Sequence, residues 1–260
     1  HNALRDYVDY LKSIINVDLT GMKVVLDCAN GASYEVAPTV FKELGANVID
    51  INTTPNGKNI NDKCGSTHPE MLQKAVVENK ADLGLAYDGD ADRLIAVDEN
   101  GNIVDGDHIM ILSAVYLKKK NQLSNNTLVI TVMTNIGLNV AAREHGINLE
   151  TTDVGDRYVI EAMKKGEFNL GGEQSGHMIF SDYNTTGDGV LSSLMLSKII
   201  MEEKKPLSEL ASIMSVYPQV LVNVEVKNEV KNKFMEVEEI KNEITRIEEL
   251  MEGSGRVLIR

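Results

Sequence analysis

The residues of this chain best suited to chemistry are three aspartates at alternate positions, Asp88, Asp90 and Asp92, followed at once by Arg93. Short apolar runs on both sides read as strands, so the carboxylates lie in a tight loop at the end of a strand. Carboxylate oxygens that converge in this way suit a hard divalent cation such as Mg²⁺, which keeps open positions for phosphate oxygens. The pattern therefore indicates phosphate chemistry assisted by a metal.

Three kinds of site have aspartates in a loop of this kind. An EF-hand calcium loop needs glycine where Arg93 stands and helices where strand-like runs stand, so it fits poorly. In an aspartyl-phosphate phosphotransferase, Asp88 itself is the nucleophile. In a magnesium cradle, the carboxylates hold the ion for a phosphoryl group supplied elsewhere. A merely solvated acidic turn is disfavoured, because the three aspartates repel one another unless a cation neutralises them.

Composition and charge exclude several classes of function. The 260-residue chain has a net charge of −13, which argues against a nucleic-acid surface. No apolar run approaches the ~18 residues of a membrane span, and the N-terminus has no signal-peptide pattern. The 2 cysteines, Cys28 and Cys64, make neither a disulfide framework nor a zinc site. We expect a reduced, cytoplasmic protein without membrane insertion.

Strand and helix signals alternate along the chain, which predicts an α/β fold with largely parallel sheets and sites at the carboxyl ends of strands. We expect two consecutive α/β/α three-layer domains, over residues 1–105 and 106–215. The start of an α+β domain is expected over 216–260, with a strand at 220–226 and an amphipathic helix over 233–252 that ends at Gly253 to Gly255.

Particular elements follow from local signals. Expected strands lie at 23–27, 48–51, 94–98, 128–132 and 149–153, and expected helices at 109–120 and 158–165. Thr67 and Glu70 have capping-box spacing, which predicts a helix that starts at Thr67 and runs to about Asn79. A strand is expected to begin at Arg256.

A second polar loop, residues 171–177, lies between two apolar runs. Its Glu173, Ser175 and His177 fall at alternate positions and offer acceptors and donors that suit sugar hydroxyls. A glycine-rich turn is the plainer alternative. Nothing around Ser175 and His177 resembles a nucleophile elbow, so a hydrolytic pair is disfavoured.

A weaker signal lies at Gly155-Asp156-Arg157. After this turn, Arg157 suits bidentate contact with a phosphate. Asp156 equally suits the N-cap of a helix, so both interpretations stay open here.

Together these motifs resemble the α-D-phosphohexomutase superfamily. The resemblance rests on Asp88 to Arg93, followed further along the chain by Gly172 to His177. Other motifs resemble its bacterial phosphoglucosamine mutase branch, namely Pro55-Asn56-Gly57 with Asn59-Ile60-Asn61, Cys64 to Glu70, Val154 to Val159, and Thr185 to Gly189. The resemblance covers essentially the whole chain.

The resemblance implies a phosphoryl shuttle. A phosphoserine on a first domain gives its phosphoryl group to glucosamine 6-phosphate, the bisphosphate turns round, and the serine takes back the other phosphoryl group. The product is glucosamine 1-phosphate, which is used to make UDP-N-acetylglucosamine and the cell wall. The resemblance favours the magnesium cradle over Asp88 as a nucleophile.

The same resemblance implies residue roles. One Mg²⁺ per active site is held by Asp88, Asp90 and Asp92, and Arg93 assists the transfer as the catalytic residue. The sugar hydroxyls are gripped by Glu173, Ser175 and His177. The substrate is oriented by Gly155, Asp156 and Arg157.

The chain departs from the family pattern at both ends. No active-site serine loop precedes His1, and Arg260 resembles the first residue of the family's phosphate-clamping loop. We therefore expect an internal fragment that lacks the first domain and most of the fourth, and that has no turnover alone. Phosphomannomutase or phosphoglucomutase activity, or a partner-binding role, stays open. The resemblance also implies a homodimeric full-length form and a membrane diadenylate cyclase as a candidate partner.

Overall fold

The computed structural model describes residues 2–220, 222–226, 233, 236–251 and 255–259. Contacts divide the chain into two compact units, His1–Ser215 and Val216–Arg260. The predicted domain limits at 105 and 215 stay predictions. None of the helices in the described part of the chain is long and apolar enough to cross a membrane.

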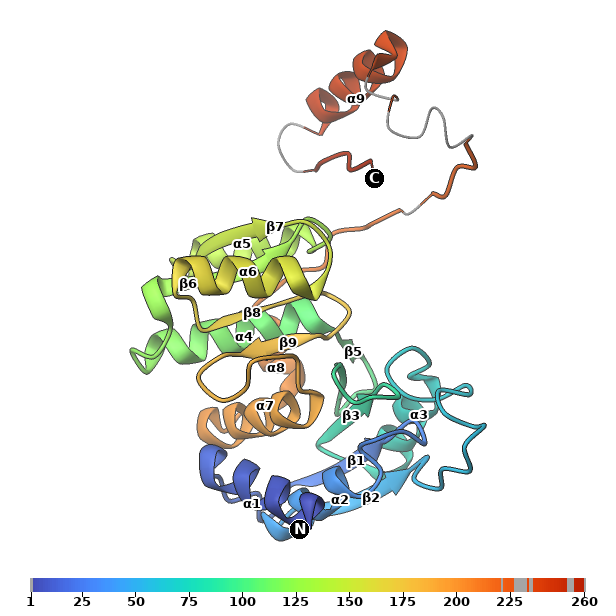
Figure 1. Cartoon of the computed structure of the whole chain (residues 1–260), viewed down its shortest axis with the longest axis vertical. Coiled ribbons are helices and arrows are strands. Elements are labelled where there is room, and N and C mark those ends of the chain that lie inside the picture. The colour runs from blue at the N-terminus through green and yellow to red at the C-terminus, as the bar shows by residue number, and fades with distance from the viewer. Residues whose placement is uncertain (1, 221, 227–232, 234–235, 252–254, 260) are drawn as a thin grey trace. The chain divides into compact units, whose positions relative to one another are not determined.

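The first half of unit His1–Ser215 alternates helices and strands (Figure 1). Its elements are α1 (Ala3–Ile15), β1 (Lys23–Asp27), α2 (Val36–Glu43), β2 (Asn47–Ile51), α3 (Glu70–Asn79), β3 (Leu83–Tyr87), β4 (Leu94–Asp98) and β5 (Ile103–Val104). The strands form one sheet in the order β2-β1-β3-β4-β5, in which β1 is parallel to β2 and β3, and β3-β4-β5 are antiparallel.

The second half repeats this strand order and these strand directions, without a strand that corresponds to β5 among the described residues. Its elements are α4 (Gly106–Lys119), η1 (Ser124–Asn126), β6 (Thr127–Thr131), α5 (Ile136–Glu144), β7 (Asn148–Thr152), α6 (Asp156–Gly166), β8 (Leu170–Gly172), β9 (Met178–Phe180), α7 (Gly189–Glu203) and α8 (Leu207–Ala211). The sheet order is β7-β6-β8-β9, with β6 parallel to β7 and β8, and β9 antiparallel to β8. The hairpin β3–β4 therefore corresponds to β8–β9.

Helices cover both faces of each sheet, which confirms the predicted α/β/α layers. Leu72 and Val76 of α3 pack on one face of the first sheet, and Val159 and Met163 of α6 pack on one face of the second. The other two faces share one large core with α1, α2, α4, α5 and α7.

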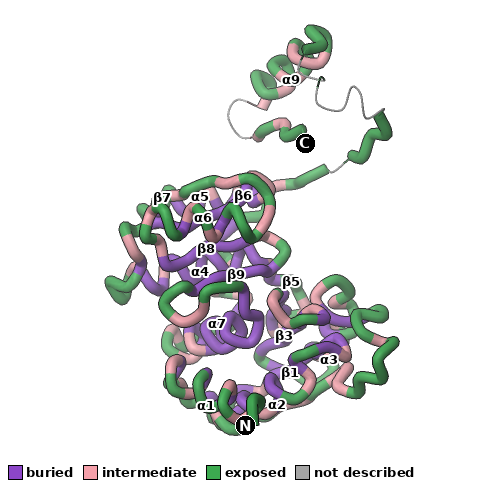
Figure 2. Tube along the Cα trace, viewed as in Figure 1, coloured by how far each residue is buried: buried purple, intermediate pink, exposed green. Residues whose placement is uncertain are grey.

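Helix α7 is the central element of that shared core. It contacts β3 and β4 of the first sheet, β9 of the second, and the helices α1 and α4 (Figure 1). Most of its residues are buried, so Figure 2 shows α7 almost entirely in purple. The burial of one helix between both sheets explains why the two halves form one compact unit.

Unit Val216–Arg260 contains α9 (Glu238–Leu250). The predicted strand at 220–226 is absent from its described residues, and its alternate valines, such as Val220 and Val224, are exposed. The residues described at 255–259 form no strand either. The predicted helix end at Gly253 lies outside the described residues, as does Arg260.

Candidate functional site

The aspartate loop, residues 88–93, directly follows β3 at the carboxyl end of the parallel strands. Asp88 and Asp92 are partly buried and Asp90 is exposed, and one carboxylate oxygen from each lies within 4.8 Å of the others. The structure thus brings together the three side chains that the sequence predicted as metal ligands.

Backbone hydrogen bonds from three separate segments hold the aspartate loop. Three alternate carbonyl oxygens accept them: Tyr87 from the Ser66 amide at 2.9 Å, Gly89 from Ala32 at 2.8 Å, and Ala91 from Gly189 at 2.9 Å. These hydrogen bonds, to the loop and to the residue before it, fix the backbone that carries the three carboxylates.

Charge accumulates on this loop. Burial, together with the smaller effect of the neighbouring carboxylates of Asp92 and Asp90, raises the pKa of the Asp88 carboxyl to about 6. The Arg93 guanidinium is 45% exposed, and its Nε lies 3.7 Å from one oxygen each of Asp88 and Asp92. Oδ1 of Asp92 is buried without a hydrogen bond. The carboxylate oxygens of Asp88, Asp90 and Asp92 suit a hard divalent cation, which would neutralise their crowded negative charge.

The loop that the sequence predicts to bind sugar hydroxyls, residues 173–177 and called the sugar loop below, joins β8 to β9 and is held from two sides. Oε1 of Glu173 accepts the Gly155 amide at 3.0 Å, and Nε2 of Gln174 donates to Oδ2 of Asp105 at 3.3 Å. The Ser175 side chain is exposed. Glu173 is therefore positioned by the 155–157 turn, and Ser175 faces solvent.

The sugar loop and the aspartate loop are in direct contact. The Leu94 amide donates to the Gly176 carbonyl at 3.0 Å, and Arg93 and His177 form an isolated antiparallel bridge. Nδ1 of His177 lies 3.0 Å from Oδ2 of Asp92. His177 is 4% exposed, so its ring faces the aspartate loop rather than the solvent.

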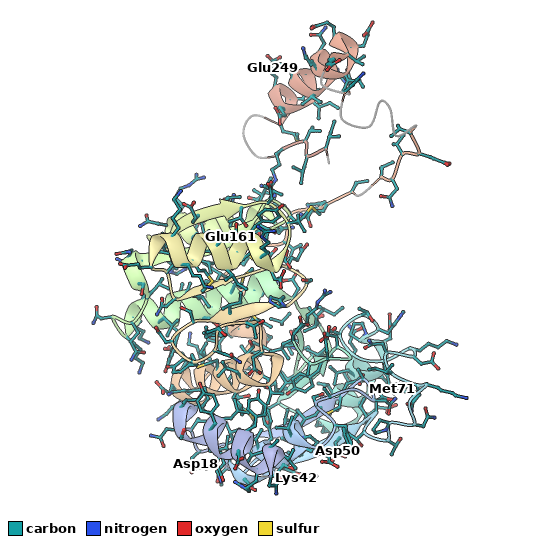
Figure 3. All side chains as sticks on the ribbon, in the orientation of Figure 1. Asp18, Lys42, Asp50, Met71, Glu161 and Glu249 are labelled. Atoms are coloured by element: carbon teal, nitrogen blue, oxygen red, sulfur yellow. The ribbon has the colours of Figure 1, made fainter. Side chains whose placement is uncertain are left out.

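The 155–157 turn is partly joined to the site. Gly155, at φ +129°, precedes α6 and reaches Glu173 through its amide. Asp156 is the first residue of α6 and accepts the Arg157 amide at 2.7 Å. The Arg157 side chain is 80% exposed, and its Nε donates at 2.8 Å to Glu161, which is labelled in Figure 3. That guanidinium pairs within its own helix.

Sequence reasoning assigned no role to several residues that build this site. Asp27, buried at the end of β1, accepts hydrogen bonds from the amides of Ala29 and Gly65 and from Nδ2 of Asn52. Asp188 caps α7 and accepts from the Tyr7 hydroxyl at 2.6 Å. The motif at 185–189 was a signal for the second, and an aspartate closing an apolar strand was a signal for the first.

Two family models match this chain. Residues 5–101 match the phosphoglucomutase/phosphomannomutase α/β/α domain II, and residues 105–217 match the corresponding domain III.

Individual proteins give the same relationship. A phosphoglucosamine mutase of Clostridioides difficile (strain 630) is 74% identical over this whole chain, which spans 58% of that relative's length. A phosphoglucomutase/phosphomannomutase family protein of Burkholderia thailandensis superimposes with a TM-score of 0.75 at 25% identity, over 91% of this chain and 52% of that one. An Aspergillus fumigatus N-acetylphosphoglucosamine mutase, solved with GlcNAc-6P and magnesium, has a TM-score of 0.71 at 21% identity, over 87% and 56% of the two chains.

Proposed function

Because this chain belongs to the phosphoglucomutase/phosphomannomutase family, we propose that it supplies the metal loop and the sugar loop of a phosphoglucosamine mutase. The whole protein interconverts glucosamine 6-phosphate and glucosamine 1-phosphate through a phosphoserine and a bisphosphate intermediate. The observation that supports the proposal is the contact between the aspartate loop and the sugar loop, because it brings three crowded carboxylates next to groups suited to sugar hydroxyls.

In this proposal, the aspartate loop serves phosphoryl transfer. Asp88, Asp90 and Asp92 hold one Mg²⁺, which when bound offsets negative charge on the transferring phosphoryl group. Arg93, the catalytic residue, is half-exposed beside the same carboxylates and adds positive charge there. The magnesium in the A. fumigatus structure supports the choice of ion.

The sugar loop binds and orients the substrate. Glu173 accepts hydrogen bonds from the sugar hydroxyls, Ser175 accepts or donates them, and the Gly155 amide keeps Glu173 in place. Arg157 exchanges its pairing with Glu161 for a phosphate when substrate binds. His177 belongs to the same loop, but its Nδ1 lies 3.0 Å from Oδ2 of Asp92 in the aspartate loop.

Other parts of the proposal rest on resemblance alone. They are the division into domains at 105 and 215, a cytoplasmic location, a homodimeric full-length form and a diadenylate cyclase partner. The 260-residue chain by itself is proposed to have no turnover, because it spans only 58% of the length of the C. difficile phosphoglucosamine mutase.

A coupled mutase assay on a longer natural form of the protein tests the function. With Mg²⁺, glucosamine 6-phosphate is compared with glucose and mannose phosphates, and Asp90→Asn is the control. Preference for glucosamine 6-phosphate, lost in Asp90→Asn, supports the proposal. Preference for glucose or mannose phosphates would instead assign phosphoglucomutase or phosphomannomutase activity to the same fold. Unchanged turnover in Asp90→Asn refutes the metal site.

A further inference from the structure

His177 lies in the sugar loop, yet its hydrogen bond is to the aspartate loop. Nδ1 is 3.0 Å from Oδ2 of Asp92, a residue 85 positions earlier in the chain. Because an ionised carboxylate only accepts hydrogen bonds, the proton of this pair is on Nδ1. The other ring nitrogen, Nε2, is buried without a hydrogen-bond partner in the described structure.

The two oxygens of Asp92 differ in their surroundings. Oδ2 faces His177, whereas Oδ1 is buried without a hydrogen bond and lies 3.7 Å from Nε of Arg93. A carboxylate fixed through one oxygen presents the other in a defined direction. Metal-binding carboxylates are commonly fixed in this way by a hydrogen bond from a residue that does not itself touch the ion.

The imidazole ring has little freedom to turn away. A Cβ added at Gly187 would lie 2.4 Å from Cε1 and 2.5 Å from Nε2 of His177, so glycine is what makes room for the ring. The backbone on both sides of the ring is also fixed, since the Gly176 carbonyl accepts the Leu94 amide and the His177 carbonyl accepts the Glu173 amide.

We propose that His177 is a positioning residue of the metal site, which orients Asp92 toward the cation, and that it is not a sugar ligand. The inference rests on the proposed function, because that function places a divalent cation at Asp88, Asp90 and Asp92. It deepens that function by making the metal site depend on a residue of the sugar loop.

The test is Mn²⁺ binding to the 260-residue chain, measured from the free-ion electron paramagnetic resonance signal. Asparagine places its amide N–H close to the position of Nδ1, whereas glutamine places it close to Nε2. His177→Gln and His177→Ala should weaken Mn²⁺ binding about 10- to 100-fold, while His177→Asn stays within about threefold of the wild type. Gly187→Ala, which displaces the ring, should weaken binding as His177→Gln does.

A matched control comes from a second buried pair. Nδ1 of His108 lies 2.7 Å from Oδ1 of Asp105, and His108 is 7% exposed. His108→Gln should leave Mn²⁺ affinity unchanged. Far-ultraviolet circular dichroism and thermal unfolding of each variant identify any that fail to fold, and the Asn and Gln variants of His177 form the decisive pair.

The outcomes separate this inference from the proposed function. If wild type binds Mn²⁺, Asp90→Asn does not, and the Asn and Gln variants of His177 bind equally well, the positioning role is wrong and the metal site stands. Equal losses in both variants also contradict the hydrogen bond from Nδ1. If Asp90→Asn does not change Mn²⁺ binding, the metal site and the inference both fail.

Discussion

The backbone amide of Gly189, the first residue of α7, donates to the carbonyl oxygen of Ala91 in the aspartate loop at 2.9 Å. The first residue of α4 repeats this contact, because the Gly106 amide donates to the Gln174 carbonyl of the sugar loop at 3.1 Å. An aspartate precedes each glycine and caps its helix. The aspartate loop and the sugar loop are therefore each hydrogen-bonded to the first residue of a buried helix.

Gly189→Ala should disturb the aspartate loop selectively. An added Cβ would lie 2.5 Å from the Arg93 carbonyl oxygen and 2.9 Å from that of Ala91, so loop or helix has to move. We expect a loss of about 1–3 kcal/mol in unfolding free energy together with weaker Mn²⁺ binding. Urea unfolding and a Mn²⁺ titration measure the two effects.

Gly106→Ala is the matched variant for the other loop. Its Cβ would lie 2.3 Å from the Glu173 carbonyl oxygen. We expect it to weaken glucosamine 6-phosphate binding, followed by saturation-transfer NMR, more than it weakens Mn²⁺ binding, which depends on this loop only through His177. Identical binding defects in the two variants would show that the helices do not hold the loops separately.

Asp27 should be among the most sensitive polar residues of the first sheet. Its buried carboxylate satisfies three donors from three segments, and Gly65 in that set directly precedes Ser66, which holds the aspartate loop. Asp27→Ala leaves these donors without an acceptor and should cost roughly 3 kcal/mol or more of unfolding free energy, measured in urea.

An exposed aspartate on the same sheet provides the comparison. Asp50, labelled in Figure 3, pairs with Lys42 at 3.2 Å on the outer edge of the sheet. Asp50→Ala should cost less than about 1 kcal/mol. Similar losses of unfolding free energy for the two substitutions would mean that the three hydrogen bonds to Asp27 do not stabilise the fold more than a surface ion pair does.

Asp107 should make stability depend on pH. Burial raises the pKa of its carboxyl to about 7, although Oδ2 accepts the Asn135 amide at 2.7 Å. An unfolded aspartate titrates near about 3.9, so between about pH 4 and 7 the folded state binds more protons than the unfolded state. The unfolding free energy should therefore fall as pH rises through this window, by up to about 1.4 kcal/mol per pH unit from this group.

Asp107→Asn isolates that contribution, because the amide does not titrate and its oxygen still accepts the Asn135 amide. Unfolding free energies of both proteins are measured from pH 4 to 8. The difference between them should change across pH 4–7 in favour of the variant at the upper end. Parallel profiles would mean that Asp107 stays ionised in the folded protein.

Local patterns were enough for the strands expected in unit His1–Ser215, but the strands expected at 220–226 and from Arg256 are absent from the described residues. The strand Lys23–Asp27 was predicted with its observed bounds, because a short apolar run closed by a polar turn has few alternatives. The signal at Thr67 was misleading: the His68 amide bonds to Gly65 in a turn, so α3 begins only at Glu70. Helix α7 was not predicted, since burial on every side removes the amphipathic period.

The links between loops lay beyond sequence reasoning. The hydrogen bond of His177 to Asp92 depends on how the two sheets pack across a shared helix, and that of Gly155 to Glu173 joins two segments of the second half that are distant in sequence. The sequence prediction of His177 as a sugar ligand therefore rested on its alternate spacing and on the family resemblance, without sight of Asp92. Helix α1 did carry a usable signal, with Val8, Leu11 and Ile15 at helical spacing.

The central claim is that the aspartate loop binds a divalent cation. Crystals of the chain grown with Mn²⁺, with diffraction data collected at the manganese absorption edge, test it most directly. The account predicts one strong anomalous peak within about 2–2.5 Å of a carboxylate oxygen from each of Asp88, Asp90 and Asp92. A fully ordered loop without a peak at saturating Mn²⁺, or a peak bound by other residues, would contradict it.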